Sequence, residues 1–159
     1  MKNGITAIIV FFCLFTACEA DDNVHVKFDQ KTYNEQKQFW QASNTKDYEY
    51  RLLARGFIMY DGKIVVENGS FKEEEIYQGE ADSSIGLLYS TIDEIYERIE
   101  GAFEFSKGKN ESDFYYSEIS VEYDTINHIP IKINYITHIP PGLAVDGVFD
   151  YTISNFKKK

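Results

Sequence analysis

The chain contains residue types that act in catalysis or metal binding, but their spacing matches no known catalytic or metal-binding motif. The three histidines, His25, His128 and His138, include no pair at i and i+4 of the kind that zinc hydrolases carry on a helix. No serine stands in a Gly-x-Ser-x-Gly turn, and the glycines form neither a phosphate loop nor a dinucleotide-binding pattern. We therefore predict no catalytic residue, no metal site and no cofactor.

Carboxylates are the abundant reactive groups, and they support one alternative function. Glu73, Glu74 and Glu75 are consecutive, with Glu80 and Asp82 close behind. Two converging carboxylates hydrolyse glycosidic bonds, so a hydrolase acting on envelope glycans is retained as the alternative. Three adjacent acids on a strand point to alternating faces, however, and this pattern favours a solvated face or a charged sheet edge.

The run Phe114, Tyr115, Tyr116 predicts a contact with a partner. Three consecutive aromatic residues in a strand place at least one ring on the outer face of the sheet. An outward aromatic ring is a plausible contact for another protein or a small ligand.

The first eighteen residues predict export and covalent lipid attachment. Residues 1 to 4 carry one positive charge and residues 5 to 15 are apolar apart from Thr6, the layout of a signal peptide. This apolar run is shorter than the roughly 20 residues that span a bilayer. The residues Leu14 to Cys18 resemble the lipobox of bacterial lipoproteins, in which the cysteine becomes the acylated first residue. We thus expect a signal peptide over 1–17 and a lipidated tether over 18–27, held at a membrane by acyl chains on Cys18. Secretion after cleavage behind Ala20 is the alternative.

Composition and charge limit the class of protein. The chain has 159 residues, 43% of them hydrophobic, and a formal net charge of -10. This is enough apolar material for one core, which predicts a single domain over 28–159. Because phosphate backbones are bound by cations, the negative charge predicts that nucleic acid is not a partner. The terminal run Lys157 to Lys159 is short enough to be a solvated tail.

Periodicity predicts two helices and six strands. A helix should run from about residue 28 to residues 41–43, with a capping box at Thr32 and Glu35. A strand follows over 47–55. Tight turns at Asp61-Gly62 and Asn68-Gly69 would then bracket a strand over 63–67 and begin another over 70–76.

The second half repeats this layout. A second helix begins at Thr91, which forms a capping box with Glu94, and apolar residues follow at 92, 95, 96, 99 and 103. Three strands then place their inward residues at odd positions: Ile119, Val121, Tyr123; Ile131, Ile133, Tyr135; Phe149, Tyr151, Ile153. The predicted fold is an α+β sandwich of two layers, in the order αβββαβββ, with an antiparallel meander sheet covered on one face by both helices.

The order of several short motifs is similar to that of the DUF6174 family, small bacterial exported proteins that are often lipoproteins and have no established activity. The motifs are Trp40, Tyr48-x-Tyr50, residues 64–69, residues 91–96, residues 121–124 with Pro130, and the closing segment 149–156. The resemblance spans about 36–156. Residues 53–56 stand where many members of the family carry Cys-x-Cys, and residues 127–129 lack the glycine usual before the family's proline. The resemblance implies export, and no catalytic residue carries over from it.

These observations together lead us to expect an envelope-anchored lipoprotein whose acidic domain binds an unidentified protein or small ligand without catalysis.

Overall fold

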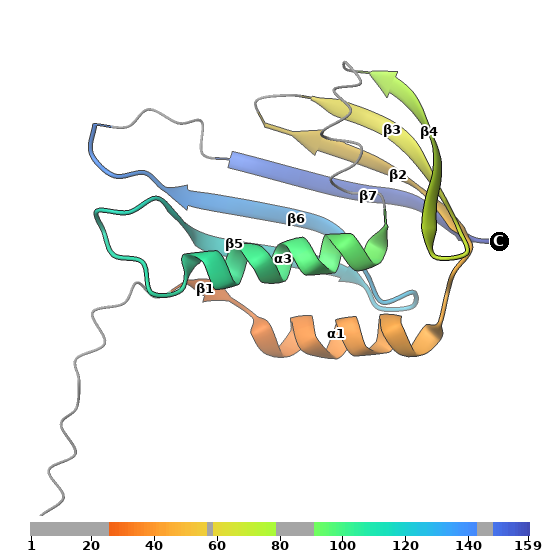
Figure 1. Cartoon of the computed structure of the whole chain (residues 1–159), viewed down its shortest axis with the longest axis horizontal. Helices are drawn as coiled ribbons and strands as arrows, with labels where there is room; N and C mark the ends of the chain where they lie inside the picture. The colour runs from red at the N-terminus through yellow and green to blue at the C-terminus, as the bar shows by residue number, and fades with distance from the viewer. Residues whose placement is uncertain (1–25, 57–58, 79–90, 143–147) are drawn as a thin grey trace, which may run out of the picture.

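The computed structural model describes residues 26–56, 59–78, 91–142 and 148–159 (Figure 1). Within these residues two helices, α1 (Gln30–Ser43) and α3 (Ile92–Ser106), accompany one sheet. The strands of that sheet are β1 (Lys27–Phe28), β2 (Tyr48–Arg55), β3 (Tyr60–Glu67), β4 (Ser70–Gln78), β5 (Tyr115–Asp124), β6 (Ile129–His138) and β7 (Val148–Lys158).

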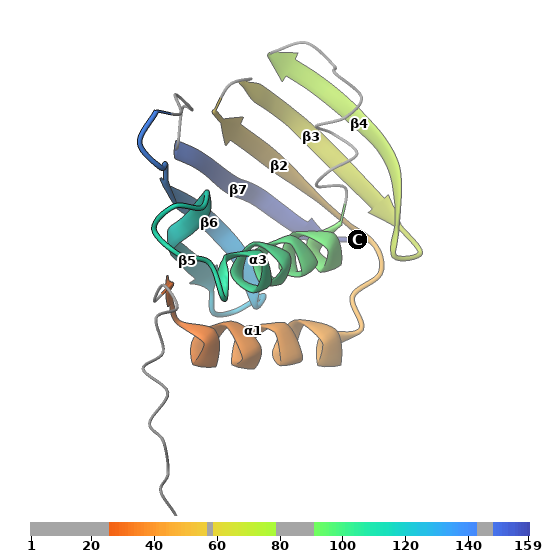
Figure 2. The ribbon, with the colours of Figure 1, turned by 60° about the vertical axis from the view of Figure 1, so that its left-hand side comes forward.

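The sheet consists of two antiparallel meanders joined side by side. Its strand order is β1-β5-β6-β7-β2-β3-β4, so the last strand, β7, lies against β2 and closes the gap between the two halves (Figures 1 and 2). The added strand β1 pairs in parallel with β5 through Lys27 and Phe28, a pairing too short for periodicity to predict. The coarse prediction of an α+β fold is confirmed.

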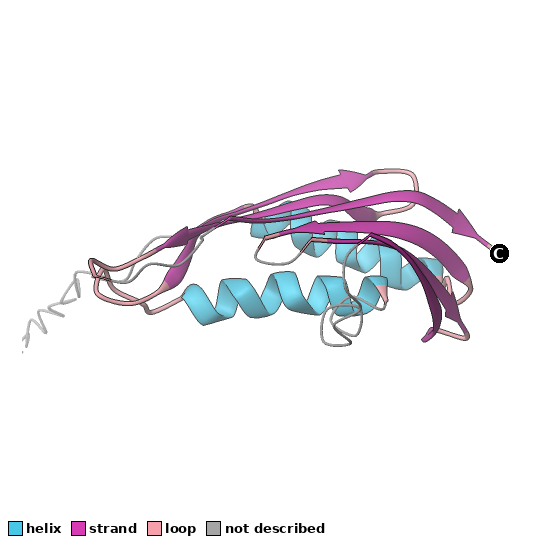
Figure 3. Ribbon diagram, turned by 90° about the horizontal axis from the view of Figure 1, so that it is seen from above, coloured by secondary structure: helices cyan, strands magenta, loops and turns pink. Residues whose placement is uncertain are grey.

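Both helices lie on one face of the curved sheet (Figure 3). They run antiparallel and contact each other directly. The Tyr33 hydroxyl of α1 donates to the backbone oxygen of Tyr96 at 2.9 Å, and Trp40 Nε1 donates to Asp93 Oδ1 at 3.1 Å. Tyr33, Trp40, Ile95, Tyr96 and Ile99 are buried in the core between the two layers. This packing holds α3 in a fixed position over β5 and β6.

The start of α1 corrects the predicted cap. Asp29, not Thr32, is the N-cap residue: its Oδ1 accepts a hydrogen bond from the Thr32 backbone N–H at 3.0 Å, and its Oδ2 accepts one from the Thr32 hydroxyl at 2.7 Å. Aspartate is among the strongest N-cap residues, so the helix begins at Gln30 and Thr32 lies in its first turn. The predicted capping box of α3 is confirmed, with Thr91 and Glu94 bonding reciprocally.

One predicted turn forms and the other does not. Asn68 and Gly69 have φ of 54° and 74° and connect β3 to β4 as expected. Asp61 and Gly62 instead lie inside β3, where Asp61 pairs with Leu53. Arg51 on β2 holds Asp61 in the strand through two hydrogen bonds of 2.7 and 2.5 Å, and the missing Cβ of Gly62 makes room for the Tyr60 hydroxyl. Gly62 is thus needed for the close approach of the Tyr60 side chain. The resulting Asp-Gly dipeptide is the same one that is typical of hairpin turns, which explains the wrong prediction.

The prediction that odd-numbered residues of β5, β6 and β7 face the core is confirmed for the predicted residues whose side chains are described. Ile119, Ile133, Tyr135 and Ile153 are buried, and Val121, Tyr123, Ile131 and Tyr151 pack partly buried against them. The side chain of Phe149 lies outside the described residues. At the start of β5 an even-numbered residue, Tyr116, faces the helices instead. A register shift between Tyr116 and Glu118 accounts for this change.

Candidate ligand pocket

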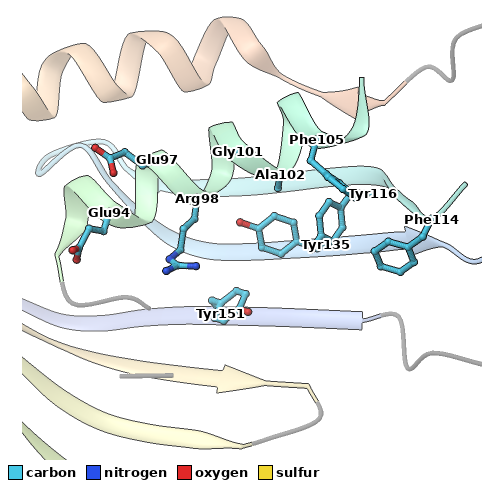
Figure 4. A pocket seen from close by; sticks show the side chains of 10 residues that line it. All are labelled: Glu94, Glu97, Arg98, Gly101, Ala102, Phe105, Phe114, Tyr116, Tyr135 and Tyr151. Carbon is cyan, nitrogen blue, oxygen red and sulfur yellow. The ribbon is translucent and has the colours of Figure 1, made fainter. Parts of the chain in front are cut away.

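A pocket of about 740 Å³ lies beside α3, over the helix-facing side of β5, β6 and β7 (Figure 4). Helix α3 buries one stripe of apolar residues in the core, and the adjacent stripe lines this pocket. Residues four and seven positions apart fall on one helical face, as Glu94, Arg98, Gly101 and Phe105 do. The complete lining is Glu94, Glu97, Arg98, Gly101, Ala102, Phe105, Phe114, Tyr116, Tyr135 and Tyr151.

Five aromatic rings form the apolar part of the pocket. Tyr116 is at their centre, with ring centroids 5.2 Å from Tyr135, 6.1 Å from Phe114 and 6.2 Å from Phe105. Tyr135 in turn lies 5.9 Å from Tyr151. The rings are inclined to one another by 51° to 81°, so they line a hollow with both faces and edges. Such a surface suits apolar or ring-bearing parts of a ligand.

The charged part of the pocket lies at the beginning of α3. Figure 4 shows Arg98 extending from α3 towards Tyr151 and the hydroxyl end of Tyr135; Glu94 extends to the same side of the helix, and Glu97 to the opposite side. Glu94 Oε2 accepts hydrogen bonds from the Thr91 backbone N–H at 2.8 Å and from the Thr91 hydroxyl at 3.0 Å. Glu97 is exposed. A carboxylate and a guanidinium therefore stand on the same side of α3 at this end of the pocket, and Glu97 is turned away from them.

The hydroxyls of Tyr116 and Tyr135 stay protonated. Burial raises the pKa of Tyr116, and burial, followed by the neighbouring Tyr151 and Tyr116, raises the pKa of Tyr135 further. Both hydroxyls are thus neutral donors at any physiological pH.

Gly101 keeps the middle of the pocket wall open. It lies inside α3, where glycine costs about 1 kcal/mol relative to alanine. A Cβ added at this position would meet no atom within 4 Å. Close packing therefore does not require the glycine, and its effect on the structure is to leave free space beside Arg98 and Phe105.

Ser106 fixes the far end of the pocket. Its side chain is buried at the last position of α3, and its hydroxyl donates to the Ala102 backbone oxygen at 2.9 Å. The Ser106 hydroxyl oxygen in turn accepts a hydrogen bond from the Tyr116 backbone N–H at 3.0 Å. This bridge joins the helix to β5 just where Phe105 and Tyr116 meet.

The structure places the three aromatic residues of the predicted partner contact in different surroundings. Phe114 and Tyr116 line the pocket. Tyr115 does not: it is buried, with its ring stacked on His138 at 4.6 Å. The rest of the lining was not predicted from the sequence, although a glycine inside the most regular helix, three residues after an arginine and four before a phenylalanine, was a usable signal.

Other candidate groups do not converge in the described residues. No group of three or more His, Cys, Asp or Glu side chains there could hold a metal ion. His128 Nδ1 lies 2.9 Å from Gln36 Oε1 in a turn, and His138 ends β6, so the two have separate structural partners. His25, Glu80 and Asp82 lie outside the described residues, as do the side chains of Glu73 and Glu74.

No protein-family model matches the chain, and no curated protein is significantly similar to it. None of the helices in the described part of the chain is long and apolar enough to cross a membrane. The predicted signal peptide and Cys18 lie outside the described residues.

Proposed function

We propose that this chain is an exported lipoprotein, anchored through Cys18, whose domain binds a small amphiphilic molecule in the pocket beside α3 without transforming it. The observation that carries the proposal is the open space at Gly101 among five aromatic rings. Pockets of a few hundred Å³ with apolar walls and few polar groups are the usual form of small-molecule sites. The resemblance to DUF6174 agrees with export and a role without catalysis.

The hydrolase alternative has weaker support. Acid-base hydrolysis of a glycan needs two carboxylates on either side of the bond that is cut. Of the two carboxylates at this pocket, Glu94 is held by Thr91 and Glu97 is exposed. Elsewhere in the described residues, Asp61 is paired with Arg51 and Glu49 with Lys63. These pairings suit stability better than proton transfer to a substrate.

Binding is tested with phenylnaphthylamine, a neutral apolar dye that fluoresces more strongly in an apolar site. We expect saturable binding to the wild-type domain and its loss in Gly101→Leu, because the new side chain fills the space beside Arg98 and Phe105. Glu104→Leu is the matched control: it adds the same side chain to the same helix outside the pocket lining. Equal dye binding by all three proteins would refute the pocket as the binding site.

The anchor is tested separately in cells. We expect the wild-type protein in the membrane fraction and Cys18→Ser outside it, since acyl chains on Cys18 supply the attachment. Mass spectrometry should find an acylated amino terminus at Cys18. A mature protein that begins at Asp21 without lipid would support simple secretion and contradict the anchor.

A further inference from the structure

Three aromatic rings meet at the end of the pocket that lies away from Arg98 (Figure 4). The ring centroids of Phe105, Phe114 and Tyr116 are 6.1 to 6.5 Å apart, and the rings are inclined to one another by 55° to 69°. All three side chains are partly exposed, and Phe105 is 47% exposed. We call these three residues the aromatic corner. Because its rings face different directions and reach solvent, one small group can contact more than one of them.

A cation of the chain itself already lies on the aromatic corner. The Nζ atom of Lys109 is 4.8 Å from the centroid of the Phe105 ring. The face of an aromatic ring attracts a cation within about 6 Å of its centroid, through the quadrupole of the ring. The aromatic corner therefore accepts positive charge, and a ligand cation that enters the pocket would compete with Lys109 for the same ring.

The charge around the aromatic corner also favours a cation. Residues 104–113, which include or adjoin its two phenylalanines, contain three acids and two lysines. One of these lysines, Lys107, is paired with Glu104 at 2.6 Å, which leaves two acids against Lys109. The whole chain has a formal net charge of -10. Its field therefore attracts a cation towards this end of the pocket and repels an anion.

The opposite end of the pocket does not decide the charge of the ligand. Arg98 and Glu94 extend to the same side of α3 there, so that end presents both signs of charge (Figure 4). Phe105 lies seven residues after Arg98, which is a rise of about 10 Å along the helix. This is longer than the screening length of about 8 Å at physiological ionic strength. The guanidinium therefore acts only weakly on a solvent-exposed group at the aromatic corner.

The groups that line the aromatic corner decide the type of cation. The described residues that line this end are Gly101, Ala102, Phe105, Phe114 and Tyr116. None of them carries a carboxylate. A primary ammonium has three N–H donors that need acceptors, whereas a quaternary ammonium has no N–H donor and is bound by aromatic faces. An alkylated ammonium thus fits this lining better than a primary one.

We infer that the ligand is a small amphiphile with an alkylated ammonium group, which lies on the aromatic corner in place of the Lys109 ammonium. Its apolar part extends from there past Gly101 over Tyr135 and Tyr151. This inference rests on the proposed function and adds the charge and the orientation of the ligand. A neutral head group would gain no attraction from the ring quadrupoles, and an anionic one would face the negative charge of the chain.

The test compares head groups on one tail. Octyltrimethylammonium, octylammonium, octanol and octanoate are titrated, below micelle formation, against phenylnaphthylamine bound to the wild-type protein. We expect octyltrimethylammonium to compete at least about fivefold more strongly than octanol, the scale of a cation–π contact at a partly exposed site. It should also compete more strongly than octylammonium, which has the same charge, and octanoate should compete most weakly.

A variant of one ring assigns the preference to the aromatic corner. Phe114→Leu keeps an apolar side chain and removes the ring, so the preference for octyltrimethylammonium over octanol should fall about threefold. Phe39→Leu is the matched control, because Phe39 is 54% exposed on α1 and does not line the pocket. This control should keep the full preference.

A variant of Lys109 tests the competition for the Phe105 ring. Lys109→Gln should strengthen competition by octyltrimethylammonium about threefold, because it removes a cation from the ring that the ligand would contact. Lys31→Gln makes the same change of net charge on α1, away from the pocket, and should have a smaller effect. Thermal unfolding checks the fold of each variant, and the wild-type head-group series decides the question even where a variant does not fold.

Two results would overturn the inference: octanol or octanoate competing as strongly as octyltrimethylammonium, or octylammonium doing so, which would mean a general attraction of cations. Either result leaves the proposed function intact if Gly101→Leu still abolishes dye binding. Loss of the proposed function shows instead as a dye that never binds, or that binds Gly101→Leu as well as it binds the wild type.

Discussion

Replacing Gly101 with alanine should make the protein more stable. Alanine is favoured over glycine inside a helix by about 1 kcal/mol, largely because glycine loses more backbone freedom on folding. The usual opposing term is a clash, and here the added Cβ meets nothing within 4 Å. Little packing is gained for the same reason. We therefore expect the free energy of unfolding to rise by about 1 kcal/mol, or the midpoint of thermal unfolding by roughly 4 °C for a domain of this size.

The measurement is urea and thermal unfolding of the protein, followed by far-ultraviolet circular dichroism. Ala102→Gly is the matched control, since it makes the reverse change at the next position of α3 and should destabilise by at least a similar amount. A destabilised Gly101→Ala protein would refute the reasoning, because it would mean that position 101 is either crowded or not helical. A stabilised Gly101→Ala would show that the glycine lowers stability, as expected if it serves the pocket.

Three further changes test other contacts. Ser106→Ala should lower the free energy of unfolding by about 1–3 kcal/mol, because the Tyr116 backbone N–H loses its acceptor; Ser112→Ala, at an exposed loop position, is the control in the same urea titration. The Arg51 guanidinium lowers the pKa of Asp61, so the pair stabilises the fold above the unfolded pKa of about 4 and loses that effect as pH falls through the lower folded value. Asp61→Asn should therefore cost up to about 1 kcal/mol near pH 7 and much less below about pH 3, and an equal cost at both pH values would contradict this. Tyr123→Phe should leave the protein equally or more stable in thermal unfolding, because the buried Tyr123 hydroxyl makes no hydrogen bond to any described residue; a marked loss of stability would point to a partner.

Prediction from sequence worked where one local pattern had one physical cause. In α3 the capping chemistry of Thr91 and the apolar period agree, and the helix forms as expected. Asn68-Gly69 takes the positive φ that a tight turn demands. Prediction from sequence failed where one dipeptide is compatible with two different structures, a turn and a strand. Asp61-Gly62 has turn chemistry, but the contact of Asp61 with Arg51 and the space that Gly62 leaves for Tyr60 are made across strands.

The sequence by itself determined the class of fold, the two helices, the hairpin at Asn68 and the inward faces of the closing strands, because each depends on residues close together in the chain. Only the tertiary structure decided that β7 lies against β2 and that Arg98, Phe114, Tyr116 and Tyr135 share one pocket. These groups come from one helix, from β5 and the residue before it, and from β6. Their meeting depends on strand order, on the register shift after Tyr116 and on the docking of α1 against α3. Such long-range packing leaves no periodic trace in a single sequence, which is why the pocket became visible only in three dimensions.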